Sequence, residues 1–288
     1  MAQAGYVYLN GDIVEAENAV VSVYDHGFLY GAGVFETFRA YQRRLFLFDA
    51  HMDRLFSGLR ELGIRLQMNR EQLREAVLRT LAANGLQDAY IRLSVTAGVA
   101  GLGLSAEDYT RPTVLVMAKE VPRFPDAMYE KGKRLLTVSI HRNTPEGHTR
   151  HKSHNFLNQV LAKRELGEQA EAEGLMLTRE GYVAEGIVSN IFLIRSGRLF
   201  TPTLATGILP GVTRAFVLRL AGELGIPAEE RDFRREALFA ADEVFLTNSI
   251  QEIVPVCEID GVTIGEGKRG PFTQRLQQAY RQHVQTGS

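Results

Sequence analysis

The sequence has 288 residues, 45% of them hydrophobic and 23% charged, and its formal net charge is −1. A chain of this length forms one large domain or two smaller ones. The near-neutral charge and the lack of a basic block argue against nucleic acid or an anionic membrane as a partner. No apolar run approaches the roughly 20 residues that a membrane-spanning helix needs.

Two features bear on location. The N-terminus has no basic segment followed by an apolar core, so we expect no signal peptide. The chain has one cysteine, Cys257, which lies in the apolar run 253–259 and cannot form an internal disulfide. A buried thiol in a reducing cytoplasm is the simple interpretation, so we expect a cytoplasmic protein.

The first half of the chain reads as mixed strands and helices. An alternating segment meets Asn10-Gly11, a type I′ hairpin signal, and Asp49 can cap a helix. The expected strands are 6–9, 13–14, 35–41, 45–48, 90–96, 113–118 and 135–140, and the expected helices are 49–62 and 70–84. This pattern predicts an α+β fold with a largely antiparallel sheet.

The second half continues with an irregular segment that ends at Lys152. The expected elements after it are a helix at 155–172, a strand at 174–178, a loop around Glu185, a strand at 190–195 leading into a hairpin, a helix that ends near 224, strands at 243–247 and 253–259, a hairpin at Asp260-Gly261, and a terminal helix from 271. Segment 121–132, with Pro122 and Pro125, is the best linker candidate. We therefore expect a small α+β domain at 1–120 and a larger domain at 133–288.

Lys152 is the candidate nucleophile. The chain has six lysines, and only Lys152 combines an irregular backbone with apolar residues immediately downstream, at Phe156 and Leu157. A lysine that forms a Schiff base must be partly desolvated, so that its amine is neutral and reactive. The alternative is an ordinary surface lysine at the start of a helix, and the neighbouring motifs must decide between them.

A phosphate site is predicted farther along. The segment GILPGVTR, from Gly207 to Arg214, precedes an amphipathic helix, so the backbone amides of Val212 and Thr213 would lie unpaired in its first turn. The polar turn Thr247-Asn248-Ser249 could add donors, and Arg54 could contribute a guanidinium. Each feature alone is weak, because Gly-Pro-Gly before a helix is usually only a cap.

Three other kinds of site were weighed. His148, His151 and His154 could bind zinc, but a structural site usually needs a fourth ligand, and we expect no metal. The glycines 265, 267 and 270 form a G-x-G-x-x-G string with too few residues after it for a Rossmann unit. A binding module without catalysis is the third alternative.

Taken together, the motifs resemble those of the class IV aminotransferase family of pyridoxal-phosphate enzymes, from Tyr8 to about Tyr280. The motifs that carry the resemblance are DHGFLYGAGVFET, HMDRL, KSHNFLNQVLAKRE, YVAEGIVSNIF, GILPGVTR and DEVFLTNSIQEIVPV. The resemblance implies a two-domain enzyme whose larger C-terminal domain has a β-barrel-like sheet with flanking helices. It also implies pyridoxal 5′-phosphate as cofactor.

The resemblance assigns roles to individual residues. Lys152 would form the Schiff base and Glu185 would pair with the pyridinium nitrogen. The implied phosphate ligands are Arg54, Val212, Thr213 and Ser249, and the implied substrate residues are Tyr30 and Arg92. Family members are usually homodimers that act on small molecules, so we expect a homodimer, and residues 26–36 could reach a neighbour's pocket.

Within the family, the segments RNTPEG, KSHNFLN and TNSIQEIVP look most like those of bacterial aminodeoxychorismate lyases. D-amino acid aminotransferases place an arginine soon after the Arg92 strand, whereas this loop reads TAGVAGLGLS. Branched-chain aminotransferases usually have Gly where this chain has Thr37, and Gly-Thr in place of Asn248-Ser249. These departures favour the lyase over a branched-chain or D-amino acid transaminase.

Overall fold

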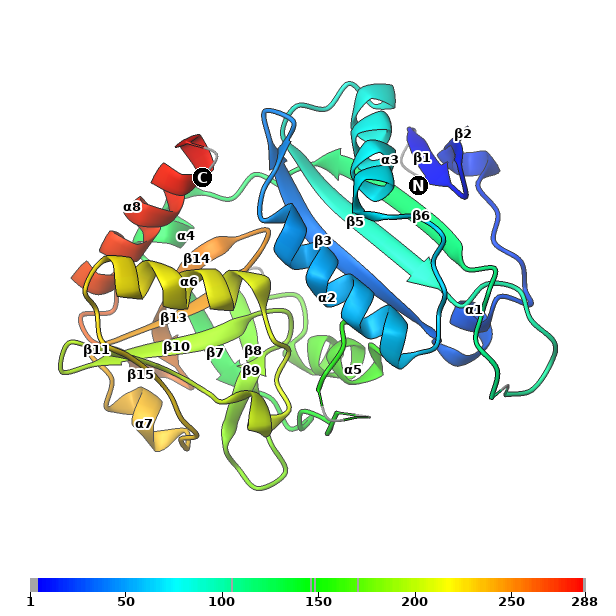
Figure 1. Ribbon diagram of the computed structural model, residues 1–288. Helices are drawn as coiled ribbons and strands as arrows, with labels where there is room; N and C mark the ends of the chain where they lie inside the picture. Colours follow the sequence, from blue (N-terminus) through cyan, green and yellow to red (C-terminus); the bar gives the residue numbers. More distant parts are fainter. Residues whose placement is uncertain (1–4, 105, 146, 148, 170, 287–288) are drawn as a thin grey trace. The chain divides into compact units, whose positions relative to one another are not determined.

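The computed structural model describes residues 5–104, 106–145, 147, 149–169 and 171–286 (Figure 1). The chain divides into two compact units. The first runs to Pro122 and includes His151–Asn155, and the second consists of Arg123–Arg150 and the chain from Phe156 onward. The predicted boundaries at 1–120, 121–132 and 133–288 stay a prediction about independently folding domains.

The first unit is built on a six-stranded antiparallel sheet with the order β2-β1-β6-β5-β3-β4. Its strands are β1 (Tyr6–Leu9), β2 (Asp12–Glu15), β3 (Gly33–Tyr41), β4 (Arg44–Leu45), β5 (Ala89–Thr96) and β6 (Thr113–Glu120), and its helices are η1 (Ala16–Asn18), α1 (His26–Tyr30), α2 (Phe48–Glu61) and α3 (Arg70–Ala83). The expected α+β pattern with an antiparallel sheet is confirmed.

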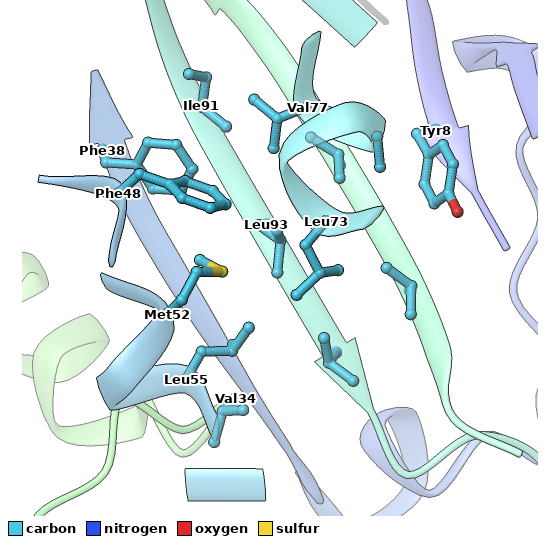
Figure 2. Close-up of a cluster of buried hydrophobic side chains, with 14 of the residues drawn as sticks. Tyr8, Val34, Phe38, Phe48, Met52, Leu55, Leu73, Val77, Ile91 and Leu93 are labelled. Atoms are coloured by element: carbon cyan, nitrogen blue, oxygen red, sulfur yellow. The ribbon is translucent and has the colours of Figure 1, made fainter. Parts of the chain in front are cut away.

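One face of this sheet carries the core of the first unit. Side chains alternate between the two faces of a strand, and Val34 and Phe38 of β3 pack with Ile91 and Leu93 of β5 beneath α2 and α3 (Figure 2). From the helices, Met52, Leu55, Leu73 and Val77 complete the cluster. The alternate positions of β3 and β5 therefore face the opposite side.

That opposite side collects polar and aromatic residues. The register pairs Phe35 with Ser94 and Thr37 with Arg92, so these four side chains share the face away from the core. This sidedness matters for the site described below.

The second unit holds a nine-stranded mixed sheet with the order β12-β11-β10-β13-β14-β7-β8-β9, and β15 pairs with β14. Its strands are β7 (Lys133–Thr137), β8 (Ala172–Leu177), β9 (Val183–Gly186), β10 (Asn190–Arg195), β11 (Arg198–Thr201), β12 (Ala228–Glu230), β13 (Glu243–Asn248), β14 (Glu252–Ile259) and β15 (Val262–Thr263). Its helices are α4 (Asp126–Glu130), α5 (Leu157–Leu166), η2 (Leu204–Thr206), α6 (Val212–Glu223), α7 (Glu236–Phe239) and α8 (Pro271–Thr286).

This sheet curls toward closure. Strands β9 and β10 stand apart in the strand order, yet the amide of Asn190 in β10 donates to the carboxylate of Glu185 in β9. Only the short segment 187–189 joins the two strands along the chain. The expected β-barrel-like sheet with flanking helices is confirmed.

Several expected elements differ from the observed ones. Helix α5 ends at Leu166 rather than 172, because Gly167 has a positive φ of 69° at its C-cap and β8 already begins at Ala172. Glu185 lies in strand β9 rather than in a loop. Helix α2 begins at Phe48 after Leu47, whose φ is 52°, and Asp49 is in the first turn instead of at the cap.

The structure also bears on the burial of Cys257 and on membrane-spanning helices. Cys257 is only partly buried, and its Sγ lies 3.3 Å from the carbonyl oxygen of Lys133, so the prediction of a buried thiol is wrong. Its place explains the difference, since residue 257 follows four buried positions at the point where the pairing of β14 with β7 shifts register. Among the described residues, no helix is long and apolar enough to cross a bilayer.

Candidate functional site

The segment that carries Lys152 belongs to the first unit, where it lies along the start of β3. The carbonyl of Lys152 accepts from the amide of Phe35 at 2.8 Å, and the amide of His154 donates to the carbonyl of Gly33 at 3.0 Å. Ser153 forms an antiparallel bridge with Val34. Lys152 and His154 therefore project to the same side as Phe35, on the face away from the core.

Phe35 is the centre of this face. Its ring is almost fully buried, with 3% exposed, and the ammonium of Lys152 lies 4.6 Å from its centroid. The guanidinium of Arg92 lies 3.7 Å from the same centroid. Burial lowers the pKa of Arg92, against a weaker raising effect of Tyr90. The predicted residues Lys152 and Arg92 thus meet on one aromatic ring.

Tyr30, the other predicted substrate residue, lies in α1 of the same unit. Its hydroxyl accepts from the amide of Gly103 at 2.9 Å, and its ring meets that of His26 edge to face. Tyr30 is about 40% exposed. It therefore helps to hold the loop after β5, which His26 also contacts through the carbonyl of Gly101 at 2.7 Å.

Arg54 is held by a buried carboxylate in the first unit. It donates from Nε and Nη2 to Glu36, at 2.8 and 2.6 Å, and His51 Nδ1 lies 2.7 Å from the same carboxylate. Burial alone would raise the pKa of Glu36, but Arg54 and His51 lower it to about 2. Burial lowers the pKa of His51 in turn, and the charge of Lys152 adds to that effect. The role of Arg54 toward phosphate stays a proposal.

Glu185 is held from three sides in the second unit. Its Oε1 accepts from Nε of Arg142 at 2.5 Å, and its Oε2 accepts from the side-chain amide of Asn190 at 3.2 Å and the backbone amide of Leu209 at 3.0 Å. The residue is 5% exposed. A carboxylate has about four acceptor positions, so these bonds leave one for a further donor.

The predicted phosphate ligands of the second unit lie at the start of α6. Val212 and Thr213 are its first two residues, and the N-cap, Gly211, provides no side-chain cap. The hydroxyls of Thr213 and Ser249 lie 3.2 Å apart, so the structure brings together two residues 36 positions apart in the chain. Backbone amides and hydroxyls at a helix N-terminus are a suitable donor set for a phosphate dianion.

One orphaned hydroxyl lies beside this donor set. Thr247 is 1% exposed and its Oγ1 has no hydrogen-bond partner among the described residues. Thr247 stands opposite Asn190 in the β10–β13 register, so both side chains share the sheet face on which Asn190 reaches Glu185. The residues present therefore fit a phosphorylated pyridine, which needs an acceptor for the ring nitrogen and donors for the phosphate.

A buried lysine elsewhere in the chain weakens the selection of Lys152 by elimination, since Lys152 itself is only partly buried. Lys133 is 6% exposed, burial lowers its pKa, and its Nζ lies 3.1 Å from Oε1 of Gln251 and 3.8 Å from Glu173. Burial raises the pKa of Glu173. The sequence around Gly132 did not predict that Lys133 is buried, because its burial comes from the pairing of β7 with β14 and β8.

No group of three or more metal-binding side chains occurs in the described part of the chain. His148 lies outside the described residues. His151 packs against α2 at Gly58, and His154 lies near the ring of Phe35, with centroids 5.9 Å apart.

The sequence interpretation missed Arg142 and Arg150. Arg142 reaches Glu185 across 43 residues of sequence. Arg150 is buried, donates to the carbonyl of Gly207 at 2.5 Å and also to the carbonyl of Asn143. The sequence offered little signal, because Arg142 directly precedes Asn-Thr-Pro but nothing in the local pattern shows that either arginine is buried.

Comparison with known proteins decides the family. The sequence profile of the Amino-transferase class IV family matches residues 33–259. The chain belongs to this family. The match covers the strands of the first unit that carry Phe35 and Arg92, the Lys152 segment, and the second unit as far as the end of β14.

Individual relatives of this member of the class IV family carry two different names. The chain is 41% identical to an aminodeoxychorismate lyase of Bacillus subtilis over 280 residues, which covers 96% of this chain and 94% of the relative. It is also 41% identical over 276 residues to a protein of Methanocaldococcus jannaschii provisionally named a branched-chain-amino-acid aminotransferase, covering 96% and 95%. A solved branched-chain amino acid aminotransferase of the organism abbreviated T.th., with pyridoxamine 5′-phosphate, has a TM-score of 0.91 at 33% identity, covering 99% and 95%.

Proposed function

We propose that this chain uses pyridoxal 5′-phosphate to split 4-amino-4-deoxychorismate into 4-aminobenzoate and pyruvate, a step of folate synthesis. The observation that carries the cofactor assignment is the buried carboxylate of Glu185, which keeps one acceptor position after its three hydrogen bonds. An anionic acceptor fixed in this way suits the protonated nitrogen of a pyridine ring.

The residues would divide the work of binding. Lys152 would hold the cofactor covalently, and Glu185 would keep the ring nitrogen protonated. The amides of Val212 and Thr213, with the hydroxyls of Thr213 and Ser249, would bind the phosphate, and we assign Arg54 to the same group. Tyr30 and Arg92 would contact the substrate. When bound, the cofactor supplies an electron sink for the carbanion formed on the substrate.

Lys152 would also handle the proton in the lyase reaction. Once the substrate amine has displaced it, its free amine is the general base that removes the proton from C4. The electron pair of that C–H bond would form a ring double bond as the C3–O bond breaks, and the ring would become aromatic. The enolpyruvate released in this way would take up a proton at its methylene carbon to give pyruvate. Aromatisation supplies the driving force, so no keto acid is required.

Two observations support the lyase over a transaminase. The B. subtilis relative, at 41% identity over most of both chains, is a lyase. Thr37 also stands in register with Arg92 on the face that carries Lys152, at a position where the branched-chain enzymes usually have glycine. A transaminase is the second candidate, favoured by the equal identity to the M. jannaschii relative. In that reaction Lys152 would carry a proton from one carbon to another and a keto acid would complete the cycle.

A paired assay on one preparation separates the two reactions. The holoenzyme is incubated with 4-amino-4-deoxychorismate and no keto acid, and pyruvate and 4-aminobenzoate are measured. Separately, it receives an L- or D-amino acid with a keto acid acceptor. We expect stoichiometric pyruvate and 4-aminobenzoate in the first assay and little turnover in the second. Turnover in the second assay alone would replace the lyase by a transaminase.

We also propose that the protein is a homodimer. Segments 20–30 and 99–104 lie side by side in the first unit, joined by a bridge between Asp25 and Val99 and by a hydrogen bond from the amide of Ala100 to the carbonyl of Tyr24. They expose large apolar side chains at Val20, Val23, Phe28, Leu102 and Leu104. Large apolar side chains exposed on two adjacent segments are typical of a protein–protein interface.

A further inference from the structure

His154 has a fixed place beside Lys152. Its backbone amide is bonded to Gly33, and the bridge between Ser153 and Val34 locks the segment onto β3. Two residues after Lys152 in an extended segment, His154 presents its ring on the same side of the sheet as the lysine. The rings of His154 and Phe35 are tilted by 48° with their centroids 5.9 Å apart.

The Nε2 atom of His154 is buried and has no hydrogen-bond partner among the described residues. An unpaired buried polar atom costs roughly 1–3 kcal/mol, so native proteins rarely keep one without a reason. Burial lowers the pKa of His154, and the charge of Arg92 lowers it further while Asp25 opposes the shift. The ring is therefore neutral at neutral pH, and Nε2 can carry its single proton as a donor.

Arg92 lies close by and carries a charge that burial disfavours. Burial lowers the pKa of Arg92, and the charge and hydrogen bond of Tyr90 raise it. Among the described residues, no carboxylate affects this pKa. A half-buried guanidinium without a carboxylate partner, next to a neutral imidazole with a vacant donor position, is a suitable pair for one anionic group.

We propose that His154 is a substrate-binding residue, and that its Nε2–H and the guanidinium of Arg92 hold the same carboxylate of the substrate on the Lys152 face of the first unit. The inference rests on the proposed function in one respect: the substrate must be an amine that bears a carboxylate. Both the lyase substrate and an amino acid meet that condition, so the inference survives either reaction.

The test measures recognition of a carboxylate separately from catalysis. Holoenzyme is titrated by calorimetry with 4-aminobenzoate and with 4-aminobenzamide, which lacks the carboxylate. A second pair, 4-methylvaleric acid and its amide, covers the case of a transaminase. We expect the wild-type protein to prefer an acid to its amide in at least one pair, and that pair is then used for the variants.

His154→Phe keeps a ring against Phe35 and removes the donor. We expect its affinity for the acid to fall about tenfold or more, as for the loss of a hydrogen bond to a charged group, while its affinity for the amide changes less than about twofold. His154→Gln keeps an N–H donor and should recover most of the acid affinity. Because both groups bind one carboxylate, the effects of His154→Phe and Arg92→Gln should not multiply in the double variant.

His283→Phe is the matched control, since His283 lies in α8 and pairs with Glu223 in the second unit; its ligand affinities should equal those of the wild type. The proposal is overturned if His154→Phe keeps the wild-type preference for the acid, if the wild type shows no preference in either pair, or if the two substitutions act independently. Failure of the proposed lyase is seen separately, as a lack of pyruvate release by the wild-type enzyme.

Discussion

Arg142 and Glu185 form the most consequential pair of side chains in the second unit. The two groups are both nearly buried, with 5% and 7% of their side chains exposed. Because removal of one partner leaves the other charge uncompensated in a poorly solvated place, such pairs are costly to break.

We therefore expect Arg142→Gln to lose roughly 3 kcal/mol of unfolding free energy and to lower kcat at least tenfold, because the carboxylate of Glu185 would lose the guanidinium that fixes its position for the proposed contact with the ring nitrogen. Denaturant unfolding and steady-state kinetics measure the two effects. The control is Arg235→Gln, whose pairing with Asp260 is more exposed, with 39% and 26% of the two side chains accessible, and should be worth about 1 kcal/mol or less. Unchanged kcat in Arg142→Gln would remove Arg142 from the site.

Lys152 and the buried Lys133 give a second prediction at this scale. Borohydride reduction of the holoenzyme followed by peptide mapping should place the cofactor on Lys152 and leave Lys133 unmodified, because Lys133 is already engaged by Gln251 and Glu173. Lys152→Ala should abolish turnover, whereas Lys163→Ala, on an exposed part of α5, should not affect it. A tag on Lys133 would contradict the assignment.

Glu36 predicts how stability responds to acid. Its pKa falls from 4.5 to about 2 in the folded protein, so the folded state holds the ionised form more strongly than the unfolded state does. The resulting stabilisation, roughly 3 kcal/mol, is fully present above pH 4.5 and is lost as the pH falls toward 2. Unfolding free energies measured between pH 6 and 3 should decline less steeply for Glu36→Gln than for the wild type. Parallel pH profiles would contradict this.

At the scale of elements, α8 depends on a cap supplied from another part of the chain. Glu243 of β13 accepts from the backbone amides of Phe272 and Thr273, at 2.9 and 2.7 Å, and from the hydroxyl of Thr273 at 2.6 Å. A carboxylate here satisfies two of the amides that a helix N-terminus leaves unpaired and also favours the helix dipole.

Glu243→Ala should therefore cost about 1–3 kcal/mol of unfolding free energy, since the buried donors of α8 would lose their acceptor. Thermal or denaturant unfolding measures this, and pyridoxal phosphate binding should be unaffected under conditions where the variant is folded. Asn69→Ala in the capping box of α3 is a matched comparison, with an expected loss of about 1 kcal/mol. Equal stability of Glu243→Ala and wild type would show that α8 needs no such cap.

The same helix shows which parts of the fold can be inferred from sequence. Local signals succeed: Asn10-Gly11 and Asp260-Gly261 take the positive φ angles that their hairpins require. The start of α8 at Pro271 is also visible, but its cap lies 29 or 30 positions away at Glu243 and could not be read locally. The overlong prediction for α5 has a similar origin, because the chain must leave the helix at Gly167 to enter β8.

In the candidate site, too, local signals can be predicted from the sequence and contacts between distant residues cannot. Lys152 and Glu185 stand in motifs that a local pattern can recognise. Arg142, Asn190 and Leu209 also stand in such motifs, but their hydrogen bonds to Glu185 form only in the folded second unit. Burial of Lys133 likewise comes from strand pairing. The sequence can therefore indicate which residues are candidates for a chemical role, but the partners of a buried charge depend on how the strands pair.

At the scale of the whole molecule, the exposed apolar patch at 20–30 and 99–104 predicts the assembly state. Phe28 is 74% exposed in α1, so Phe28→Glu should preserve the protomer fold and place a charge in the proposed interface. Sedimentation velocity should find a dimer for the wild type and a monomer for the variant. The control is Val262→Glu, an exposed apolar position in β15, which should stay dimeric. A monomeric wild type that is fully active would contradict the proposal.

Residues 151–155 group with the first unit, although the chain on both sides of them groups with the second. During synthesis, the strands of the first unit emerge from the ribosome well before this segment does. The hydrogen bond from the amide of Phe35 to the carbonyl of Lys152 can form only after residue 152 has been added. A nascent chain of about 120 residues therefore lacks the segment that carries Lys152. The first unit can therefore complete its folding only after the ribosome has synthesised residues 151–155.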